Sequence, residues 1–420
     1  MVSHHRTEDP LGAGFRELWD QLAPVGRDPD SGGYLRYAFT PAERELRNWF
    51  AAQAKRRGMP VTDDGNGNLF AWWAAPDTAD DGPAAEAGTA ATARAVLTGS
   101  HFDSVPHGGG YDGPLGIVSA FLAIDELRRA GTVPVRPIGV AAFVEEEGAR
   151  FGVPCLGSRL LAGAFDPDRA AELRDADRVS FAEALGARPA GARPDLLARV
   201  GAYLELHVEQ GRALAGGAAP VGVASAIWPH GRWRFEFDGE ANHAGTTRMA
   251  DRRDPMLTYA FTVLAANKEA RLRGAHATIG RVRVEPNATN AVPGRVTGWL
   301  DARAAEPAVL DELVEAVRAK AADRARRDGT GLTVVAESTS PLVAFDDDLG
   351  ARLARLLGAP VLPTAAGHDA GVLAGQVPTA MLFVRNPTGV SHSPAEHATE
   401  ADCVAGVRAL AGALAELACR

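Results

Sequence analysis

The first part of the chain alternates short apolar runs with an amphipathic segment. Continuous apolar runs at residues 95–98 and 137–144 are typical of buried strands, and between them apolar residues recur at helical spacing over residues 115–130. A strand, a helix and a second strand in this order favour a mainly parallel sheet covered by helices. We therefore predict an α/β domain. Its other predicted elements are helices at 14–22, 41–57 and 400–418 and strands at Val61, 68–73 and 203–207.

The pattern changes in the middle of the chain. Residues 233–237 alternate polar and apolar, as a strand with one buried face does. Helices are predicted at 255–270 and 309–326, with strands at 277–284 and 296–303 between them. This β-α-β-β-α order suits a small α+β domain with an antiparallel sheet. The predicted organisation is a first domain formed by residues 1–222 and 337–420, with a smaller domain inserted at 223–336.

Composition agrees with a two-domain globular protein. A chain of 420 residues exceeds one ordinary core, and 46% hydrophobic residues suffice for two. The formal charge of −9, from 44 basic and 53 acidic residues, is spread without a basic stripe. That distribution argues against nucleic acid and anionic membranes as partners.

The sequence shows no targeting signal, and this observation together with the cysteine usage predicts a cytoplasmic location. Residues 1–9 contain no apolar leader core, and no run approaches the length of a membrane span. Residues 76–94, rich in Ala, Gly, Thr and Asp, are predicted to form a surface loop. Cys155, Cys403 and Cys419 are widely spaced, which argues against a disulfide framework or a thiolate metal site.

Metal-ligating residue types lie where the predicted sheet would build a site. His101 follows the strand at 95–98 and Asp112 precedes the helix at 115–130, a position where open α/β sheets bind ligands. Two divalent cations about 3.5–4 Å apart need one ligand that touches both, and a carboxylate such as Asp112 can do so. Imidazole and carboxylate ligands suit Zn²⁺, Mn²⁺ or Co²⁺. The candidate terminal ligands are His101, Glu147, His207 and His392.

Two neighbouring groups add to this hypothesis. Asp103 stands two residues from His101 and is predicted to accept the imidazole N–H that faces away from the metal. The carboxylates of residues 145–147 follow a buried strand, where like charges repel one another unless cations neutralise them. A charged surface loop is the alternative interpretation of that triplet.

Eight short segments occur in the order found in a known family. They are GSHFDSV with GGGYDGPLG, FVEEEGARFG, ELHVEQG, GEANHAGTTRM, PNATNAVPG, LDAR, AGHDA and GVSHSP. Through them the chain resembles the M20-type metallo-amidohydrolases, specifically the branch of N-carbamoyl-L-amino-acid hydrolases, β-ureidopropionases and allantoate amidohydrolases. The resemblance extends over nearly the whole chain.

The resemblance implies a ligand set and a quaternary state. The first of two divalent ions would be held by His101, Asp112 and His207, and the second by Asp112, Glu147 and His392. Glu146 matches the general base of the family. The inserted domain matches a lid and dimerisation module, so the resemblance implies a homodimer in which His243 reaches the site of the neighbouring subunit.

Substrate contacts are also implied. Arg303 matches a carboxylate-binding arginine, although a surface salt bridge is an equal alternative from the residues alone. Asn290 and His243 match residues that hold the ureido or amide oxygen, which needs donors as it gains negative charge. Gln210, His230, Gly367 and His368 complete the predicted substrate-binding set. For residues 367–370 a simple turn is the alternative.

The expected activity is that of a binuclear-metal amidohydrolase that cleaves the C–N bond of a small ureido carboxylate and releases ammonia. A carboxylate beside a metal-activated water can take its proton, which is the role expected of Glu146. Allantoate and N-carbamoyl-L-amino acids both remain open as substrates, because Arg248 and His230 depart from the family pattern. The alternatives are a metallo-dipeptidase or N-acyl amino-acid deacylase, and a non-catalytic binding protein of the same fold. No Gly-x-Ser-x-Gly motif supports a serine nucleophile.

Overall fold

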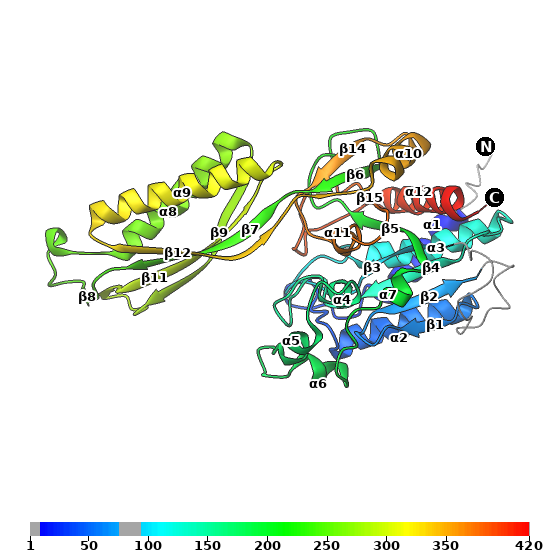
Figure 1. Cartoon of the computed structure of the whole chain (residues 1–420), viewed down its shortest axis with the longest axis horizontal. Coiled ribbons are helices and arrows are strands. Elements are labelled where there is room, and N and C mark those ends of the chain that lie inside the picture. Colours follow the sequence, from blue (N-terminus) through cyan, green and yellow to red (C-terminus); the bar gives the residue numbers. More distant parts are fainter. Residues whose placement is uncertain (1–8, 75–93, 420) are drawn as a thin grey trace, which may run out of the picture. The chain divides into compact units, whose positions relative to one another are not determined.

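The chain forms two compact units. The structure, a computed structural model, describes residues 9–74 and 94–419 (Figure 1). Unit 1 comprises Met1–Ser225 and Ala344–Arg420, and unit 2 comprises Ala226–Val343. The predicted boundaries at 223 and 336 fall inside strands β6 (Val221–Ile227) and β12 (Gly331–Ser340). Apart from Asp9 and Arg94, the segments 1–9 and 76–94 lie outside the described residues.

Unit 1 is built on a nine-stranded sheet whose centre is parallel, as predicted. Strands β4 (Ile138–Phe143), β3 (Ala95–His101), β5 (Val200–Val208) and β15 (Thr379–Val384) lie side by side and parallel. Antiparallel strands flank them, with β2 beside β4 and β6 beside β15. The outer strands are β1 (Val61–Asp63), β2 (Leu69–Trp73), β6, β13 (Val343–Ala344) and β14 (Val361–Thr364).

Strand β15 was not predicted. All six of its residues are buried, and its short apolar run at 380–384 fits a buried strand and a buried helical segment equally well. Its place beside β5 is a pairing between segments far apart in the sequence, with Phe383 opposite His207. Periodicity within one segment carries no information on such a partner.

The predicted long helices pack on the sheet of unit 1. Helix α3 (Pro114–Arg129) starts with a proline at its first turn and is buried along most of its length. It packs against α1 (Pro10–Leu22), α12 (Glu400–Ala418) and the central strands, which join it in one apolar core. Helix α2 (Pro41–Arg56) adds Leu46 and Phe50 to the same core. The start of α3 directly follows Asp112 and so fixes the position of that residue.

The polar stretch 166–199 contains three short helices that the periodicity did not resolve. They are α5 (Pro167–Glu172), α6 (Phe181–Leu185) and α7 (Pro194–Leu197). Local caps start two of them: Asp166 accepts the N–H of Arg169, and Ser180 forms a capping box with Glu183. The described residues of unit 1 also form helices α4 (Leu156–Leu161), α10 (Asp347–Leu357) and α11 (Asp369–Leu373).

Unit 2 is the α+β arrangement expected of the inserted segment. Strands β7 (His230–Asp238), β9 (His276–Glu285) and β11 (Arg295–Arg303) join β12 in an antiparallel sheet in the order β12-β7-β11-β9. Helices α8 (Pro255–Arg273) and α9 (Pro307–Asp328) lie against this sheet (Figure 1). Strand β12 was not predicted.

The two faces of this second sheet differ in polarity. Phe235, Phe237 and Leu300 are buried in a core that also contains residues of α8 and α9. Alternate residues on the same strands, such as Arg232 and Arg303, point to the opposite face and remain partly or fully exposed. A small two-stranded ladder, β8 (Asn242–His243) with β10 (Ala291–Val292), extends the unit. Within residues 9–74 and 94–419, no helix combines the length and apolarity of a membrane span.

Candidate metal centre

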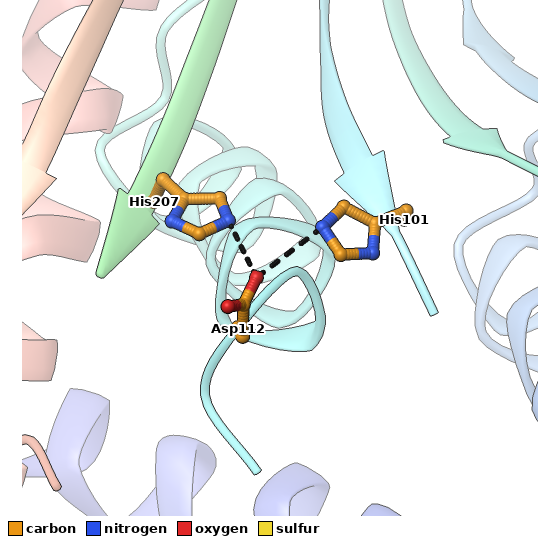
Figure 2. Close-up of side chains that lie close together, drawn as sticks. All are labelled: His101, Asp112 and His207. Carbon is orange, nitrogen blue, oxygen red and sulfur yellow. Dashed lines mark ion pairs between the residues drawn. The ribbon is translucent and has the colours of Figure 1, made fainter. Parts of the chain in front are cut away.

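The predicted ligands of unit 1 meet at the carboxyl ends of its parallel strands. His101 is the last residue of β3, and His207 is the last but one of β5. Glu147 follows β4, and His392 lies in the segment after β15. Because these four strands are adjacent and parallel, their ends lie at one edge of the sheet. Figure 2 shows both strand-end imidazoles facing Asp112, which precedes α3.

Asp112 presents one carboxylate oxygen to each of two groups of ligands. Its Oδ1 lies 3.5 Å from His101 Nε2 and 3.1 Å from His207 Nε2. Its Oδ2 lies 3.4 Å from His392 Nε2, and that nitrogen is 3.5 Å from Glu147 Oε2. The groups His101–Asp112–His207 and Asp112–Glu147–His392 each have ligand atoms close enough to hold one cation. A carboxylate shared in this way is what a two-metal site requires.

The two buried imidazoles are oriented as metal ligands. His101 Nδ1 lies 3.0 Å from the backbone oxygen of Asp103, and His207 Nδ1 lies 2.8 Å from that of Val208. When Nδ1 donates to a carbonyl, the neutral ring carries its lone pair on Nε2. Both Nε2 atoms are buried and face Asp112, and neither has a hydrogen-bond partner among the residues that the structure describes. Lone pairs directed at a carboxylate repel it unless a cation or a proton lies between, so the donor set fits a divalent metal ion.

The prediction that the carboxylate of Asp103 accepts the imidazole N–H of His101 was wrong. The backbone carbonyl oxygen of Asp103, and not its carboxylate, accepts the hydrogen bond from His101 Nδ1. The buried carboxylate instead accepts the backbone N–H groups of Glu146 at 3.2 Å and Glu147 at 3.0 Å. Asp103 therefore fixes the turn after β4. Residue spacing does not distinguish a side-chain acceptor from a backbone acceptor at the same residue.

The three consecutive glutamates have different surroundings. Glu145 adopts a φ of 56° and turns away, and its carboxylate accepts the backbone N–H groups of Arg150 and Phe151. Glu146 points to the cluster, with Oε2 3.8 Å from His101 Nε2 and Oε1 3.3 Å from the thiol of Cys155. Glu147 faces His392. The triplet is largely buried, which excludes the alternative of a charged surface loop.

Burial determines the electrostatics of the cluster. Desolvation raises the pKa of Glu146 well above its usual range, although His101 opposes the shift. Desolvation, followed by the charge of Asp112, raises the pKa of Glu147 to about 7. Asp112 behaves in the opposite way: desolvation raises its pKa, but His207 and His101 outweigh that effect and hold the pKa well below its ordinary value. A divalent cation would replace the protons that these groups retain.

Gln210 lies inside the cluster. Its Nε2 donates to Asp112 Oδ2 at 2.7 Å and lies 3.2 Å from Ser391 Oγ. Its Oε1 is buried and finds no hydrogen-bond partner within residues 9–74 and 94–419. The residues that sequence reasoning missed are Cys155, Ser391 and Glu396, which contact Glu146 or Asp112. Ser391 and Cys155 stand inside or beside quoted motifs, but neither spacing nor residue type indicated their partners.

The segment 367–370 is more than a surface turn. His368 is buried beside the first ligand group, with its ring centroid 4.5 Å from that of His207. In the described part of the chain, its Nε2 has no hydrogen-bond partner. Asp369 is also fully buried and accepts a hydrogen bond from Ser158 Oγ. Gly367, in contrast, is exposed.

Arg303 and His230 lie opposite each other in unit 2. They are paired in register on β11 and β7. Arg303 Nε and Nη2 donate to the two oxygens of Asp301 at 2.8 and 3.1 Å. His230 Nδ1 lies 3.0 Å from the backbone oxygen of Trp228, and desolvation lowers the pKa of His230. The guanidinium is thus held in one orientation by a bidentate contact.

His243 and Asn290 are brought together by the β8–β10 ladder. The backbone oxygen of Asn290 accepts the N–H of Ala244 at 3.0 Å. His243 Nδ1 accepts the backbone N–H groups of Gly245 at 3.0 Å and Thr246 at 3.2 Å. Neutral His243 must therefore carry its proton on Nε2. The imidazole both caps the turn and presents an N–H donor from an exposed position.

Comparisons with known proteins find relatives that match nearly the whole chain. The model of peptidase family M20/M25/M40 matches residues 97–416. The chain is 38% identical to the N-carbamoyl-L-amino acid amidohydrolase of Geobacillus stearothermophilus, over 94% of this chain and 96% of that protein. It is 32% identical to the allantoate amidohydrolase of Escherichia coli K12, over 100% and 99%. A solved amidase of the hydantoinase/carbamoylase family from Burkholderia multivorans matches with a TM-score of 0.83 at 32% identity, over 97% and 98%.

Proposed function

The chain belongs to peptidase family M20/M25/M40, and we propose that within this family it is a binuclear-metal amidohydrolase that cleaves the C–N bond of a ureido carboxylate and releases ammonia. One observation carries the proposal: Asp112 lies between two groups of ligands, with one oxygen toward each. Two divalent ions, drawn from Zn²⁺, Mn²⁺ and Co²⁺, are the proposed cofactors.

The residues of the cluster divide the work. When bound, the two cations would supply an activated water and polarise the scissile carbonyl. Glu146 contributes a carboxylate beside the first ligand group that is not itself in either group, so it is free to take a proton and pass it to the leaving nitrogen. His101, Asp112, Glu147, His207 and His392 are the proposed ligands.

Several polar residues are the proposed substrate contacts. Arg303, whose planar fork is already oriented by Asp301, is the proposed partner of the substrate carboxylate. His243 and Asn290 are proposed to donate to the ureido oxygen as it gains negative charge. Gln210, His230, Gly367 and His368 are the further proposed substrate contacts. Allantoate and N-carbamoyl-L-amino acids are the two substrate classes, as named for the E. coli and Geobacillus relatives.

A homodimer is part of the proposal. Helix α8 exposes Leu257, Phe261 and Leu264, which recur at helical spacing on one face, and further along it Leu272. Their exposed fractions lie between 38% and 71%, and apolar groups aligned in this way mark an interaction surface. We propose that a second copy of the chain covers this face. All three cysteines are free thiols, which is consistent with the proposed cytoplasmic location.

The test is a substrate panel. Chain stripped of metal and reloaded with Mn²⁺, Zn²⁺ or Co²⁺ is incubated with allantoate, N-carbamoyl-L-amino acids, a dipeptide series and N-acetyl amino acids. Ammonia release from allantoate and N-carbamoyl-L-amino acids, with no cleavage of dipeptides or N-acetyl amino acids, supports the proposal. Cleavage of dipeptides or N-acetyl amino acids alone would assign the site to a dipeptidase or deacylase. Turnover of none, with two ions bound, would favour the binding protein of the same fold.

A further inference from the structure

We propose that Glu396 is a positioning residue for the second cation, because its buried carboxylate ties the segment that carries Asp112 to the segment that carries His392. This inference rests on the proposed two-cation function. It concerns a residue that lies outside both ligand groups.

Each oxygen of Glu396 serves one of the two segments. Oε1 accepts the backbone N–H groups of Tyr111 and Asp112, both at 3.0 Å. Oε2 accepts the hydroxyl of Ser391 at 3.1 Å. The residue is only 5% exposed, so these contacts replace water around a buried carboxylate. One side chain therefore joins two segments, with Asp112 and Glu396 separated by 284 positions in the sequence.

Ser391 connects this tie to Asp112 itself. Its hydroxyl lies 3.3 Å from Asp112 Oδ2 and 3.1 Å from Glu396 Oε2, but it has only one hydrogen to donate. When Asp112 Oδ2 is used as a metal ligand, that hydrogen is directed to Glu396. The contact between Ser391 and Glu396 is thus the one that persists in a loaded site.

The segment around His392 requires such support. His392 adopts a φ of 54°, a region that costs energy for residues other than glycine. Its side chain is 49% exposed, whereas those of His101 and His207 are almost completely buried at the ends of sheet strands. The second cation would therefore depend on a less embedded ligand than the first. Loss of Glu396 should weaken binding of the second cation more than binding of the first.

The side chain of Glu396 packs directly against Gly109, where a larger residue would not fit. A Cβ built on Gly109 would collide with the side chain of Glu396. The Gly109→Ala substitution therefore displaces the carboxylate without changing any charge. Tyr111 keeps an independent apolar anchor, since its ring stacks on Trp19 with centroids 4.6 Å apart. The fold around the segment has support that does not depend on Glu396.

The experiment measures metal binding and not turnover. Chelator-stripped full-length chain is dialysed against graded concentrations of Mn²⁺, and bound Mn²⁺ per subunit is determined. Wild type is expected to bind two ions. Glu396→Ala should keep the tighter ion and bind the other about 10–100-fold more weakly, the range found when groups that orient metal ligands are removed. Gly109→Ala should act in the same direction. Glu396→Gln should lose less, because its amide oxygen still accepts both backbone N–H groups.

The control is Glu400→Gln, which removes a nearby carboxylate that pairs with Arg16 and contacts neither segment. It should bind both ions as wild type does. Two ions bound with wild-type affinity by folded Glu396→Ala, or equal weakening of both ions, would overturn the proposal. If Glu396→Ala does not fold, Glu396→Gln and Gly109→Ala decide by the same criterion. A wild type that binds two ions but releases no ammonia from ureido carboxylates would remove the substrate assignment alone, whereas fewer than two ions would remove both proposals.

Discussion

A carboxylate oxygen of Asp103 accepts the backbone N–H of Glu147 at 3.0 Å, so the turn that delivers the glutamates is held through the main chain. The other oxygen receives the backbone N–H of Glu146 in the same way. Side-chain substitutions in this turn therefore leave its anchoring contacts in place. That separation of backbone and side-chain roles makes the proposed chemistry of each glutamate testable.

Glu146→Gln is expected to keep both metal ions and to lose most of kcat. The amide retains the size and the backbone contacts of the glutamate but cannot take a proton, and general-base catalysis is typically worth about 10²–10⁴-fold. Ammonia release and metal content should be measured on the same preparation. Glu147→Gln is the contrasting variant, because it removes a proposed ligand and should lower metal content. Near-normal turnover in Glu146→Gln would contradict the assigned role.

Exhaustive chelation is expected to abolish activity, and Mn²⁺, Zn²⁺ or Co²⁺ should restore it. The proposed ligands are imidazoles and carboxylates, and the buried Nε2 atoms of His101 and His207 have no hydrogen-bond partner among the described residues. Activity is assayed before and after dialysis against a chelator, with metal analysis at each stage. Full activity in a chain shown to contain no metal would rule out the two-metal mechanism.

Arg303→Lys is expected to raise KM for carboxylate-bearing substrates while changing kcat less. An ammonium group cannot reproduce the bidentate fork, and hydrogen bonds to charged groups are worth about 1.5–3 kcal/mol, so KM should rise roughly tenfold or more. The matched control is Arg232→Lys, since Arg232 lies 3.6 Å from the same Asp301 but is more exposed. An unchanged KM for every active substrate would place Arg303 outside the binding site.

Asp369→Asn is expected to remove part of the pH dependence of stability. Desolvation, together with Glu205, raises the pKa of Asp369 to about 8, compared with about 3.9 for an unfolded aspartate. The folded chain then holds a proton that the unfolded chain releases. The stabilising contribution is complete below about pH 4, declines by at most about 1.4 kcal/mol per pH unit as pH rises, and is lost above about pH 8.

Urea denaturation of the metal-stripped chain between pH 5 and pH 9 measures this effect. The free energy of unfolding of wild type should fall more steeply over that interval than that of Asp369→Asn. Ser158→Ala is a useful companion, because it removes the hydroxyl that bonds to Asp369 and leaves the carboxyl group in place. Parallel curves for wild type and Asp369→Asn would show that Asp369 is already ionised in the folded chain.

Mixing His243→Ala with Glu146→Gln is expected to recover part of the activity that each variant lacks alone. If His243 acts on the site of the neighbouring subunit, a mixed dimer contains one site in which both residues are intact. Activity is measured after subunit exchange, with exchange followed by native mass spectrometry. Activity is also measured for a mixture of His243→Ala with Arg303→Lys, to test whether recovery depends on which second variant is mixed with His243→Ala. Exchange without recovery would mean that His243 serves its own subunit or none.

Local sequence patterns were enough to predict the parallel centre of unit 1 and the residue types of the candidate metal centre. Apolar runs at 95–98 and 137–144 indicate β3 and β4 because burial on both faces of a strand requires continuous apolar residues. His101 and Asp112 could be placed at one strand end because a single loop joins that strand to a helix. These inferences depend on contacts between residues close in sequence. Local sequence patterns were therefore sufficient for these inferences.

Only the tertiary structure decided which distant groups meet and through which atoms. Residues 380–384 of β15 form a short apolar run that a buried helix would also fit, and β15 pairs with a strand from the other part of unit 1, so no local pattern revealed it or the route by which His392 reaches Asp112. The carboxylate of Asp103 accepts backbone N–H groups, and Glu396 is joined to Asp112, which lies 284 positions earlier in the sequence. Main-chain donors are the same for every residue type except proline, so residue identity cannot indicate which of them a buried carboxylate will find.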